Sequence, residues 1–478
     1  MRYHPPSKWV LGPWYGTGFP DFGKSCGSYG KTHEDEIGYD LDNLTKHDIP
    51  ITCYHCDGTA WARNDTLVLS DAMIQRLREK KVRLLLHLWG QDDLATWKRT
   101  HDRIGDVLGG YYLDEKFKAR IGGDDETSLK AMDIVRKMLP RDGEVILKTY
   151  GPKTSTDAGL KKIGHVCYVN DLGVDWGGLR TGIRRVFSKS QFLPAPYNEF
   201  TAYDVDKNRR PVEEIYFRRL HWGAMQVVMD NSPWVDCDPW TWGYSPRLLE
   251  AYRYWSWLHL ELAAYLHSYD YNAYETNEMI FRQPNAAAYT TKLGEEIFVA
   301  YVTDTMKELA IELPAGEWIN YWDESQVLQG KVTYPVPLGK EPIFIRNGSM
   351  IPLDVSRAYT GHGTAESAGS LTVLVYPKGE CLFKYRDDGL DVWVTFKAAA
   401  AGDKLTLTAS RAPSQSVLYR IAHMAAPQSV SVEGLSVKIN QGGNLARAAS
   451  EKEVNGSKTS AWYYDSPAKR LIVKAMLK

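Results

Sequence analysis

The stretch Gly109-Gly110-Tyr111-Tyr112-Leu113-Asp114-Glu115 is a short apolar run that leaves a pair of glycines and ends on a carboxylate. The residues that follow, 116–126, are polar, and a helical pattern begins near Ser128. This order predicts a strand, a loop and a helix, with an acid at the carboxyl end of the strand. In a barrel of parallel strands that end lines the mouth where chemistry takes place, although an aspartate there also commonly caps a loop.

The same order of strand, loop and helix recurs along the first half of the chain. Short apolar runs alternate with helical patterns over roughly 270 residues, which is the size and rhythm of a (β/α)8 TIM barrel. An open doubly wound sheet is the alternative, but no glycine-rich phosphate turn follows the first strand. The eight strands are expected at 10–14, 51–57, 82–90, 109–114, 144–150, 165–171, 191–195 and 226–231.

The second half of the chain has a different pattern of apolar and polar residues. A chain of 478 residues is too long for one compact core, and after residue 273 short alternating segments with turn residues take over. Examples are 297–302, 343–346 and 371–376, a pattern typical of antiparallel sandwiches. The expected domains are an α/β barrel over 1–273, a proximal C-terminal β-sandwich over 274–355 and a distal one over 356–478.

Composition and charge limit the kinds of molecule that this protein is expected to bind. The net charge of −1 favours neither nucleic acid nor an anionic membrane, and no apolar run is long enough to cross a bilayer. The 16 Trp and 29 Tyr suit stacking on sugar faces, but large aromatic residues are also common in cores. The N-terminus has no apolar segment of a signal peptide, so we expect a cytoplasmic protein, or a secreted or periplasmic one if a leader has been removed.

Three segments of the β-rich half carry a family resemblance. They are LPAGEW followed by Tyr321-Trp322, PIFIRNGSMIP, and VYP followed by YRDDG, within 313–322, 342–352 and 375–389. These segments resemble glycoside hydrolase family 31, the retaining α-glycosidases related to α-glucosidase, α-xylosidase and α-galactosidase. The resemblance implies a TIM barrel followed by β-sandwich domains, a carbohydrate substrate and no cofactor.

The barrel half carries further matches in the same order. Gly110 to Asp114 lines up with the family's nucleophile strand, and Asp171 to Leu179, which includes Trp176, lines up with its acid/base segment. The resemblance implies that Asp114 is the nucleophile and that Asp171 is the general acid/base. Such a pair needs its carboxyl groups about 5–5.5 Å apart. Both residues end strands that open into the same mouth, which makes this separation feasible.

Other acids and aromatic residues near the strand ends have two interpretations each. Asp57 could hold a sugar hydroxyl or cap a turn, and Trp89 could form a stacking wall or lie in the core. Asp175 is a rival of Asp171, but its place at a helix start favours a capping role. The residues expected to bind substrate are Tyr112, Asp57, Trp89, Trp176, Arg218 and Asp230.

The sequence also departs from the family pattern. Arg218 lines up with a family arginine and could keep Asp114 ionised, or pair with Glu214 at helical spacing. Asp230 and Ser232 stand where the family has an arginine and a histidine. An acid in place of a basic residue would change which hydroxyls are held, so we expect an altered sugar specificity. The family's glycine-rich segment is not recognisable at 196–200.

Three functions follow from these observations. The first is a retaining exo-α-glycosidase that hydrolyses terminal α-linked sugars through a covalent glycosyl-aspartate intermediate. The second is a sugar-binding relative without turnover, since no upstream β-sandwich precedes the barrel. The third is a metal-dependent hydrolase using His55, His87 and Asp57, although no tight histidine spacing is present and no metal is expected. A dimer that lends a loop to the site would replace the missing domain, which leaves a homo-oligomer open.

Overall fold

The computed structural model describes residues 7–17, 33–56, 69–88, 102–113, 139, 143–148, 166–169, 172–191, 193–201, 211–231, 239–240 and 243–478. The chain divides into two compact units. Unit 1 comprises Met1–His259, Asn272–Tyr289 and Tyr301–Thr305, and unit 2 comprises Leu260–Tyr271, Thr290–Ala300 and Met306–Lys478. The three predicted domain ranges stay a prediction. Within the described ranges, no helix combines the length and apolar character needed to span a membrane.

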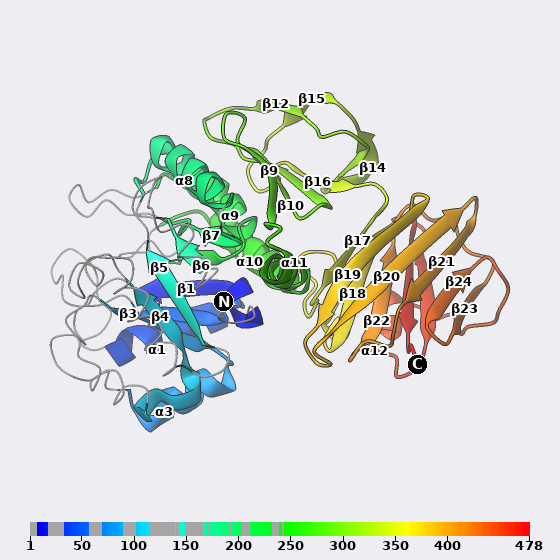
Figure 1. Cartoon of the computed structure of the whole chain (residues 1–478), viewed down its shortest axis with the longest axis horizontal. Coiled ribbons are helices and arrows are strands. Elements are labelled where there is room, and N and C mark those ends of the chain that lie inside the picture. Colours follow the sequence, from blue (N-terminus) through cyan, green and yellow to red (C-terminus); the bar gives the residue numbers. More distant parts are fainter. Residues whose placement is uncertain are drawn as a thin grey trace. The chain divides into compact units, whose positions relative to one another are not determined.

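Unit 1 contains an eight-stranded sheet in which each pair of neighbouring strands is parallel. The strand order is β7-β6-β5-β4-β3-β2-β1-β8, so successive strands of the chain lie side by side and β8 lies next to β1. The strands are β1 (Pro13–Thr17), β2 (Cys53–Cys56), β3 (Arg83–Leu88), β4 (Leu108–Leu113), β5 (Glu144–Lys148), β6 (Val166–Tyr168), β7 (Ala195–Tyr197) and β8 (Met229–Asn231). The predicted mixed α/β class is confirmed (Figure 1).

The seventh strand begins later than its apolar residues suggest. We predicted a strand at 191–195, but the structure places it at Ala195–Tyr197. The preceding helix runs to Lys189, and the chain turns before the strand begins. Leu193 is buried although it precedes the strand, so its apolar character reflects burial and not strand pairing.

Helices follow several of the strands of the unit 1 sheet along the chain (Figure 1). Their starts obey local rules: the hydroxyl of Ser70 accepts a hydrogen bond from the Met73 amide at 3.1 Å and so caps its helix. The helical elements in this part of the chain are η1 (Lys8–Leu11), α1 (His33–Lys46), α3 (Asp71–Glu79), η3 (Gly105–Val107), α8 (Trp176–Lys189), α9 (Glu213–Ala224), α10 (Pro246–Glu261) and α11 (Ala263–Thr276).

The rest of the chain is rich in antiparallel strands, as the sequence predicted. The first of these strands are β9 (Phe281–Asn285), β10 (Thr290–Leu293), β11 (Ile297–Ala300), β13 (Trp318–Asn320), β14 (Asp323–Leu328) and β16 (Ile343–Arg346). In unit 2, β14, β13, β16, β11 and β10 are neighbours in one sheet, in that order. A separate antiparallel pair joins β12 (Glu308–Glu312) to β15 (Lys331–Pro335).

Two five-stranded sheets form the C-terminal part of unit 2 (Figure 1). One has the order β17-β18-β22-β26-β25 and the other β19-β20-β21-β24-β23. The rings of Phe396 on β20 and Tyr419 on β22 meet at 6.3 Å, which packs one sheet against the other. The elements are β17 (Ser349–Leu353), η5 (Ala365–Ser367), β18 (Ser370–Tyr376), β19 (Glu380–Asp387), β20 (Val392–Ala401), β21 (Lys404–Ala409), β22 (Ser416–Ile421), β23 (Val430–Glu433), β24 (Ser436–Ile439), α12 (Glu451–Gly456), β25 (Ala461–Asp465) and β26 (Arg470–Ala475).

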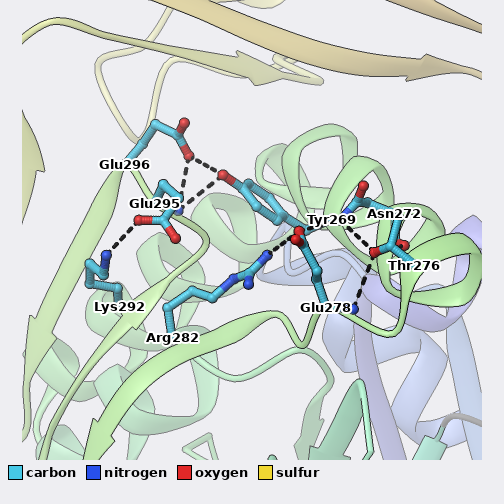
Figure 2. Close-up of polar contacts among 8 residues, drawn as sticks. All are labelled: Tyr269, Asn272, Thr276, Glu278, Arg282, Lys292, Glu295 and Glu296. Atoms are coloured by element: carbon cyan, nitrogen blue, oxygen red, sulfur yellow. Dashed lines mark hydrogen bonds and ion pairs between the residues drawn. The ribbon is translucent and has the colours of Figure 1, made fainter.

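A buried glutamate ties a helix to a hairpin in unit 2 (Figure 2). The hydroxyls of Tyr265 and Tyr269 on α11 donate to the carboxylate of Glu296 at 2.8 and 2.7 Å, in the turn between β10 and β11. Burial raises the pKa of Glu296, and the two tyrosine hydrogen bonds counteract this. The neighbouring Glu295 pairs with Lys292 at 2.5 Å. The carboxylate therefore organises local structure here.

Candidate functional site

Four predicted site residues, Asp57, Trp89, Asp114 and Asp171, lie outside the described residues, and their roles stay predictions. The strands that lead to them are described. β2, β3 and β4 end at the residue immediately before the first three, and β6 ends at Tyr168. The chain therefore reaches each predicted position from the carboxyl end of a strand in one parallel sheet.

The register of the sheet relates the strands of the two predicted catalytic acids. Leu113 of β4 pairs with Leu147 of β5, and Leu147 pairs with Cys167 of β6. Leu113 and Cys167 are therefore level, with one strand between them. Neighbouring strands are about 4.8 Å apart, which puts these two backbones about 10 Å apart.

Ring-bearing side chains from β1, β2, β4, β6 and β7 form a continuous series of contacts in unit 1. The ring of Tyr112 lies 4.9 Å from His55 and 5.6 Å from Tyr168. Tyr168 lies 5.7 Å from Tyr197, whose ring lies 5.5 Å from Trp14. Trp14 is on β1 and Tyr197 is on β7, which are not neighbours in the strand order. The predicted sugar-binding residue Tyr112 is 3% exposed and packs in this series of rings.

Two buried acids lie at the ends of β7 and β8. Asp230 is within β8, as predicted, and is 1% exposed. Glu199, which sequence reasoning did not single out, follows β7, is 6% exposed, and accepts a hydrogen bond from the Tyr168 hydroxyl. Burial and then the charges of Asp230 and Glu199 raise the pKa of Tyr197 well above its usual range. This strand end thus combines low solvent access with negative charge.

The ends of β7 and β8 are also joined through their backbones. The amide of Phe200 donates to the carbonyl of Asp230 at 3.0 Å. The side chain of Gln226 bridges to the Asn198 backbone, accepting from its amide at 2.8 Å and donating to its carbonyl at 2.9 Å. These bonds hold the two acid-bearing segments against each other.

The predicted Arg218 lies on α9 and is 3% exposed. Burial, and then the positive charge of Arg218, lower the pKa of His221 to about 3. The alternative partner that we considered, Glu214, accepts a hydrogen bond from the Thr305 hydroxyl at 3.2 Å. A role for Arg218 in substrate binding stays a prediction.

The adjacent Arg219 was not predicted. Its side chain has no exposed surface, and its guanidinium donates to the carbonyls of Gly173, of Phe200 at 3.2 Å and of Asp175 at 3.4 Å. Burial lowers its pKa to about 10, while the charges of Asp175 and then Glu199 act in the opposite direction. The one sequence signal was an arginine pair flanked by the apolar residues Phe217 and Leu220.

Asp175 and Trp176 begin helix α8. The carboxylate of Asp175 accepts a hydrogen bond from the Gly178 amide at 2.8 Å, so this acid is the N-cap of the helix. The capping role that we favoured for it is confirmed. Trp176 is the first helical residue and is half-buried.

The metal-dependent alternative involves residues that are only partly described. Among the described side chains, no group of three or more His, Cys, Asp and Glu is arranged to hold a metal ion. Asp57 and the side chain of His87 are outside that set, and His55 packs in the series of rings.

The chain is similar in sequence and in fold to several known proteins. A model of the glycosyl hydrolase family 31 C-terminal domain matches residues 272–351. A solved structure of a cycloalternan-forming enzyme from Listeria monocytogenes, in complex with a pentasaccharide substrate, superposes on 100% of this chain with a TM-score of 0.79 at 15% identity. The chain is a relative of glycoside hydrolase family 31. The match to the family's C-terminal domain confirms the family resemblance read from the sequence.

Two further matches are to a dextranase and to a glycosyl-transferring enzyme. A family 31 dextranase from Flavobacterium johnsoniae, solved with glucose, superposes on 98% of this chain and 70% of its own, with a TM-score of 0.75 and 16% identity. An isomaltosyltransferase from Sporosarcina globispora is 27% identical over 172 residues. That alignment covers 34% of this chain and 15% of the transferase.

This family 31 relative is shorter than the proteins it matches. It spans 54% of the cycloalternan-forming enzyme, and the part that aligns with the isomaltosyltransferase spans 15% of that protein. At 15 and 16% identity, the likeness to the two solved structures concerns the fold.

Proposed function

We propose that this chain is a retaining enzyme that cleaves terminal α-glucosidic bonds and passes the glucosyl group to water or to a sugar hydroxyl. The observation that carries the proposal is the register of β4, β5 and β6. It makes Leu113, which precedes Asp114, level with Cys167, which lies four residues before Asp171. At this level the two backbones are about 10 Å apart, and both chains continue past the same edge of the sheet toward the aspartates, whose carboxyl groups would have to come within the 5–5.5 Å that retention needs.

A closed (β/α)8 barrel is part of this proposal. An open sheet keeps its terminal strands apart, whereas a barrel brings them together. The contact between Trp14 and Tyr197 and the hydrogen bond from Phe200 to Asp230 both favour closure. In such a barrel the carboxyl ends of all eight strands share one mouth, where family 31 relatives would place substrate.

The proposed chemistry uses the two aspartates in turn. The Asp114 carboxylate attacks the anomeric carbon while the Asp171 carboxyl protonates the departing glycosidic oxygen, so one C–O bond forms as the other breaks. Asp171, now ionised, removes a proton from the incoming water or hydroxyl. That oxygen attacks the anomeric carbon and releases Asp114. Two inversions at one carbon retain the α configuration.

The surroundings of Asp114 and Asp171 would determine which of the two is ionised and which is protonated. A cation such as Arg218 would favour the ionised form of Asp114. Burial would favour the protonated form of Asp171. Glu199 and Asp230, buried at the ends of β7 and β8, are suited to accept hydrogen bonds from sugar hydroxyls. Because Asp230 replaces a basic residue of the family, the hydroxyls that it selects would differ from those of the usual α-glucosidase.

Glycosyl transfer is a second candidate outcome of the same intermediate. Two of the matched proteins are named for transfer or ring-forming reactions, an isomaltosyltransferase and a cycloalternan-forming enzyme, and the third is a dextranase. All three names favour an α-glucan as donor. Whether water or sugar accepts the glucosyl group depends on which acceptor occupies the mouth.

The test combines substrates, acceptors and two variants. The wild type would be incubated with aryl α-glucosides and isomaltose, and the anomer released first would be identified by NMR. We expect the α anomer, or longer oligosaccharides when sugar acceptor is added. Asp114→Asn is expected to lose at least about a thousandfold in kcat. Asp171→Asn should keep activity on substrates with good leaving groups, which need little protonation.

Three results would contradict the proposal in whole or in part. A β anomer as first product would exclude retention. Binding of isomaltose by calorimetry without turnover, unchanged in Asp114→Asn, would identify a sugar-binding protein. The protein could also neither bind nor turn over α-glucosides and yet turn over another α-glycoside. That result would reject glucose as the sugar, while the proposed retaining mechanism would still stand.

A further inference from the structure

Helix α9 carries a buried cation, Arg219, that the proposed mechanism does not use. The guanidinium of Arg219 has no exposed surface and donates to the carbonyls of Gly173, Asp175 and Phe200. A buried charge is costly unless hydrogen bonds and opposite charges compensate it. The negative charges of Asp175 and Glu199 stabilise the positively charged guanidinium of Arg219. With a pKa of about 10 the side chain is protonated at neutral pH.

These three carbonyls belong to two different strand-to-helix connections. Gly173 and Asp175 lie between β6 and α8, and Phe200 follows β7. A guanidinium presents its N–H groups in a rigid planar fork, so it fixes the direction of each carbonyl as well as its distance. Arg219 therefore joins the connection after β6 to the one after β7.

The segment held by Arg219 packs closely against the start of helix α8. The Asp175 carboxylate caps α8 by accepting from the Gly178 amide. A methyl group at Gly178 would come within 1.9 Å of the Gly173 carbonyl oxygen, so the loop lies directly against the first turn of the helix. A methyl group at Gly182 would come within 2.5 Å of the Leu172 side chain, which therefore packs against the next turn.

We propose that Arg219 is a positioning residue for the general acid/base Asp171. Leu172 and Gly173 directly follow Asp171 in the chain, so the backbone that leaves this aspartate is held by the packing of Leu172 and by the hydrogen bonds of Arg219. A shift of about 1 Å in a reacting group costs on the order of a hundredfold in rate. The inference rests on the proposed function, because it assigns Arg219 a role through the acid of that mechanism.

The test measures kcat/KM for a series of aryl α-glucosides whose leaving groups differ in pKa. For Arg219→Lys, which keeps the charge but not the planar fork, we expect about a 10- to 100-fold loss with poor leaving groups. With good leaving groups we expect little change, because they depart without protonation. Asp175→Ala removes the cap and loosens the same segment while costing the fold little. It should show the same leaving-group dependence to a smaller degree.

Arg420→Lys provides the matched control. Arg420 is a buried arginine of unit 2, so its variant reports the general cost of changing such a residue. We expect this variant to lose thermal stability without any leaving-group dependence. A loss in Arg219→Lys that is equal for all leaving groups, or no loss at all, would overturn the positioning role and leave a structural one. Leaving-group dependence in Asp175→Ala alone would overturn it as well.

Asp171→Asn, measured on the same series, separates this inference from the proposed function. If Asp171→Asn shows leaving-group dependence and Arg219→Lys does not, the acid assignment holds and the role of Arg219 is wrong. If Asp171→Asn is active on all substrates without such dependence, the acid assignment itself fails, and the inference about Arg219 fails with it.

Discussion

Units 1 and 2 each bury an arginine, but they give it different partners. In unit 1 the guanidinium of Arg219 donates to three backbone carbonyls. In unit 2 the guanidinium of Arg420 donates to the Glu451 carboxylate and, at 3.0 Å, to the Gly361 carbonyl. Burial lowers the pKa of both side chains.

The difference separates two uses of a buried charge. A side-chain ion pair such as Arg420–Glu451 joins one side chain to another and stabilises the packing between elements. A guanidinium that holds carbonyls fixes the path of the backbone itself. Unit 2 follows the first use again in Arg386, which pairs with Asp391 and lies 3.9 Å from the centre of the Tyr271 ring. We therefore expect variants of Arg420 and Arg386 in unit 2 to change stability, and variants of Arg219 in unit 1 to change activity.

The largest expected effect is on kcat, and it distinguishes Asp114, which follows a strand of unit 1, from Asp387, which ends a strand of unit 2. Asp114→Asn should lower kcat at least about a thousandfold with little change in thermal unfolding, since it removes a nucleophile. Asp387 at the end of β19 accepts from the Ser414 amide and hydroxyl, both at 2.7 Å. Asp387→Asn should cost about 1–3 kcal/mol of unfolding free energy and leave kcat unchanged. A normal kcat in Asp114→Asn would break the comparison.

The second prediction concerns the ion pair of unit 2. Arg420→Met removes the partner of Glu451, whose side chain is 23% exposed, and leaves a partly buried carboxylate. Loss of one partner from a buried pair costs about 3 kcal/mol or more, and partial exposure places this case at the lower end. Chemical denaturation should report this loss. The double variant Arg420→Met/Glu451→Leu should recover part of it, and a further loss in the double variant would contradict the pairing.

The third prediction uses pH to act on unit 1. Burial lowers the pKa of His221 to about 3 and of His259 to about 4, so the folded state keeps both neutral. The unfolded chain takes up protons below pH 6.5, so stability is lost as pH falls from 6.5, at about 1.4 kcal/mol per pH unit for each histidine.

His221→Phe sharpens this test, because the new ring can keep the contacts of His221 with Trp255 and Tyr301 but cannot titrate. At pH 5 the stability loss relative to pH 7 should shrink by about 2 kcal/mol. In unit 2 the pKa of Glu296 is raised by burial, so its contribution has the opposite sign: stability is lost as pH rises through 4.5. An unchanged acid response in His221→Phe would reject the neutral histidine.

The smallest effect concerns Glu199. If its carboxylate holds a sugar hydroxyl, Glu199→Gln should weaken one charge-assisted hydrogen bond and lower kcat/KM about tenfold. Glu296→Gln, a matched buried glutamate in unit 2, should leave kcat/KM unchanged. Steady-state kinetics with isomaltose would compare the two. Equal kinetics for both variants would place Glu199 among structural acids.

Several features of this protein follow from sequence alone. Alternating strand and helix patterns predicted the mixed α/β class, because the periodicity of apolar residues is a local property that burial of one face requires. The acid Asp175 was correctly assigned to a helix cap, since capping depends on only a few neighbouring residues. The family motifs in the β-rich half were likewise readable as contiguous residues.

Other features required the tertiary structure. Arg218 and Arg219 are adjacent, and their sequence context distinguishes them poorly, but successive residues of a helix point about 100° apart. Only the fold could place the carbonyls of Gly173 and Phe200 around the second of them. Glu199 was missed for the same reason: nothing in its neighbours along the chain reveals the Tyr168 hydroxyl that it meets from another strand. Local pattern determined the elements of this protein, and contacts between residues distant in sequence decided which charges lie at the strand ends.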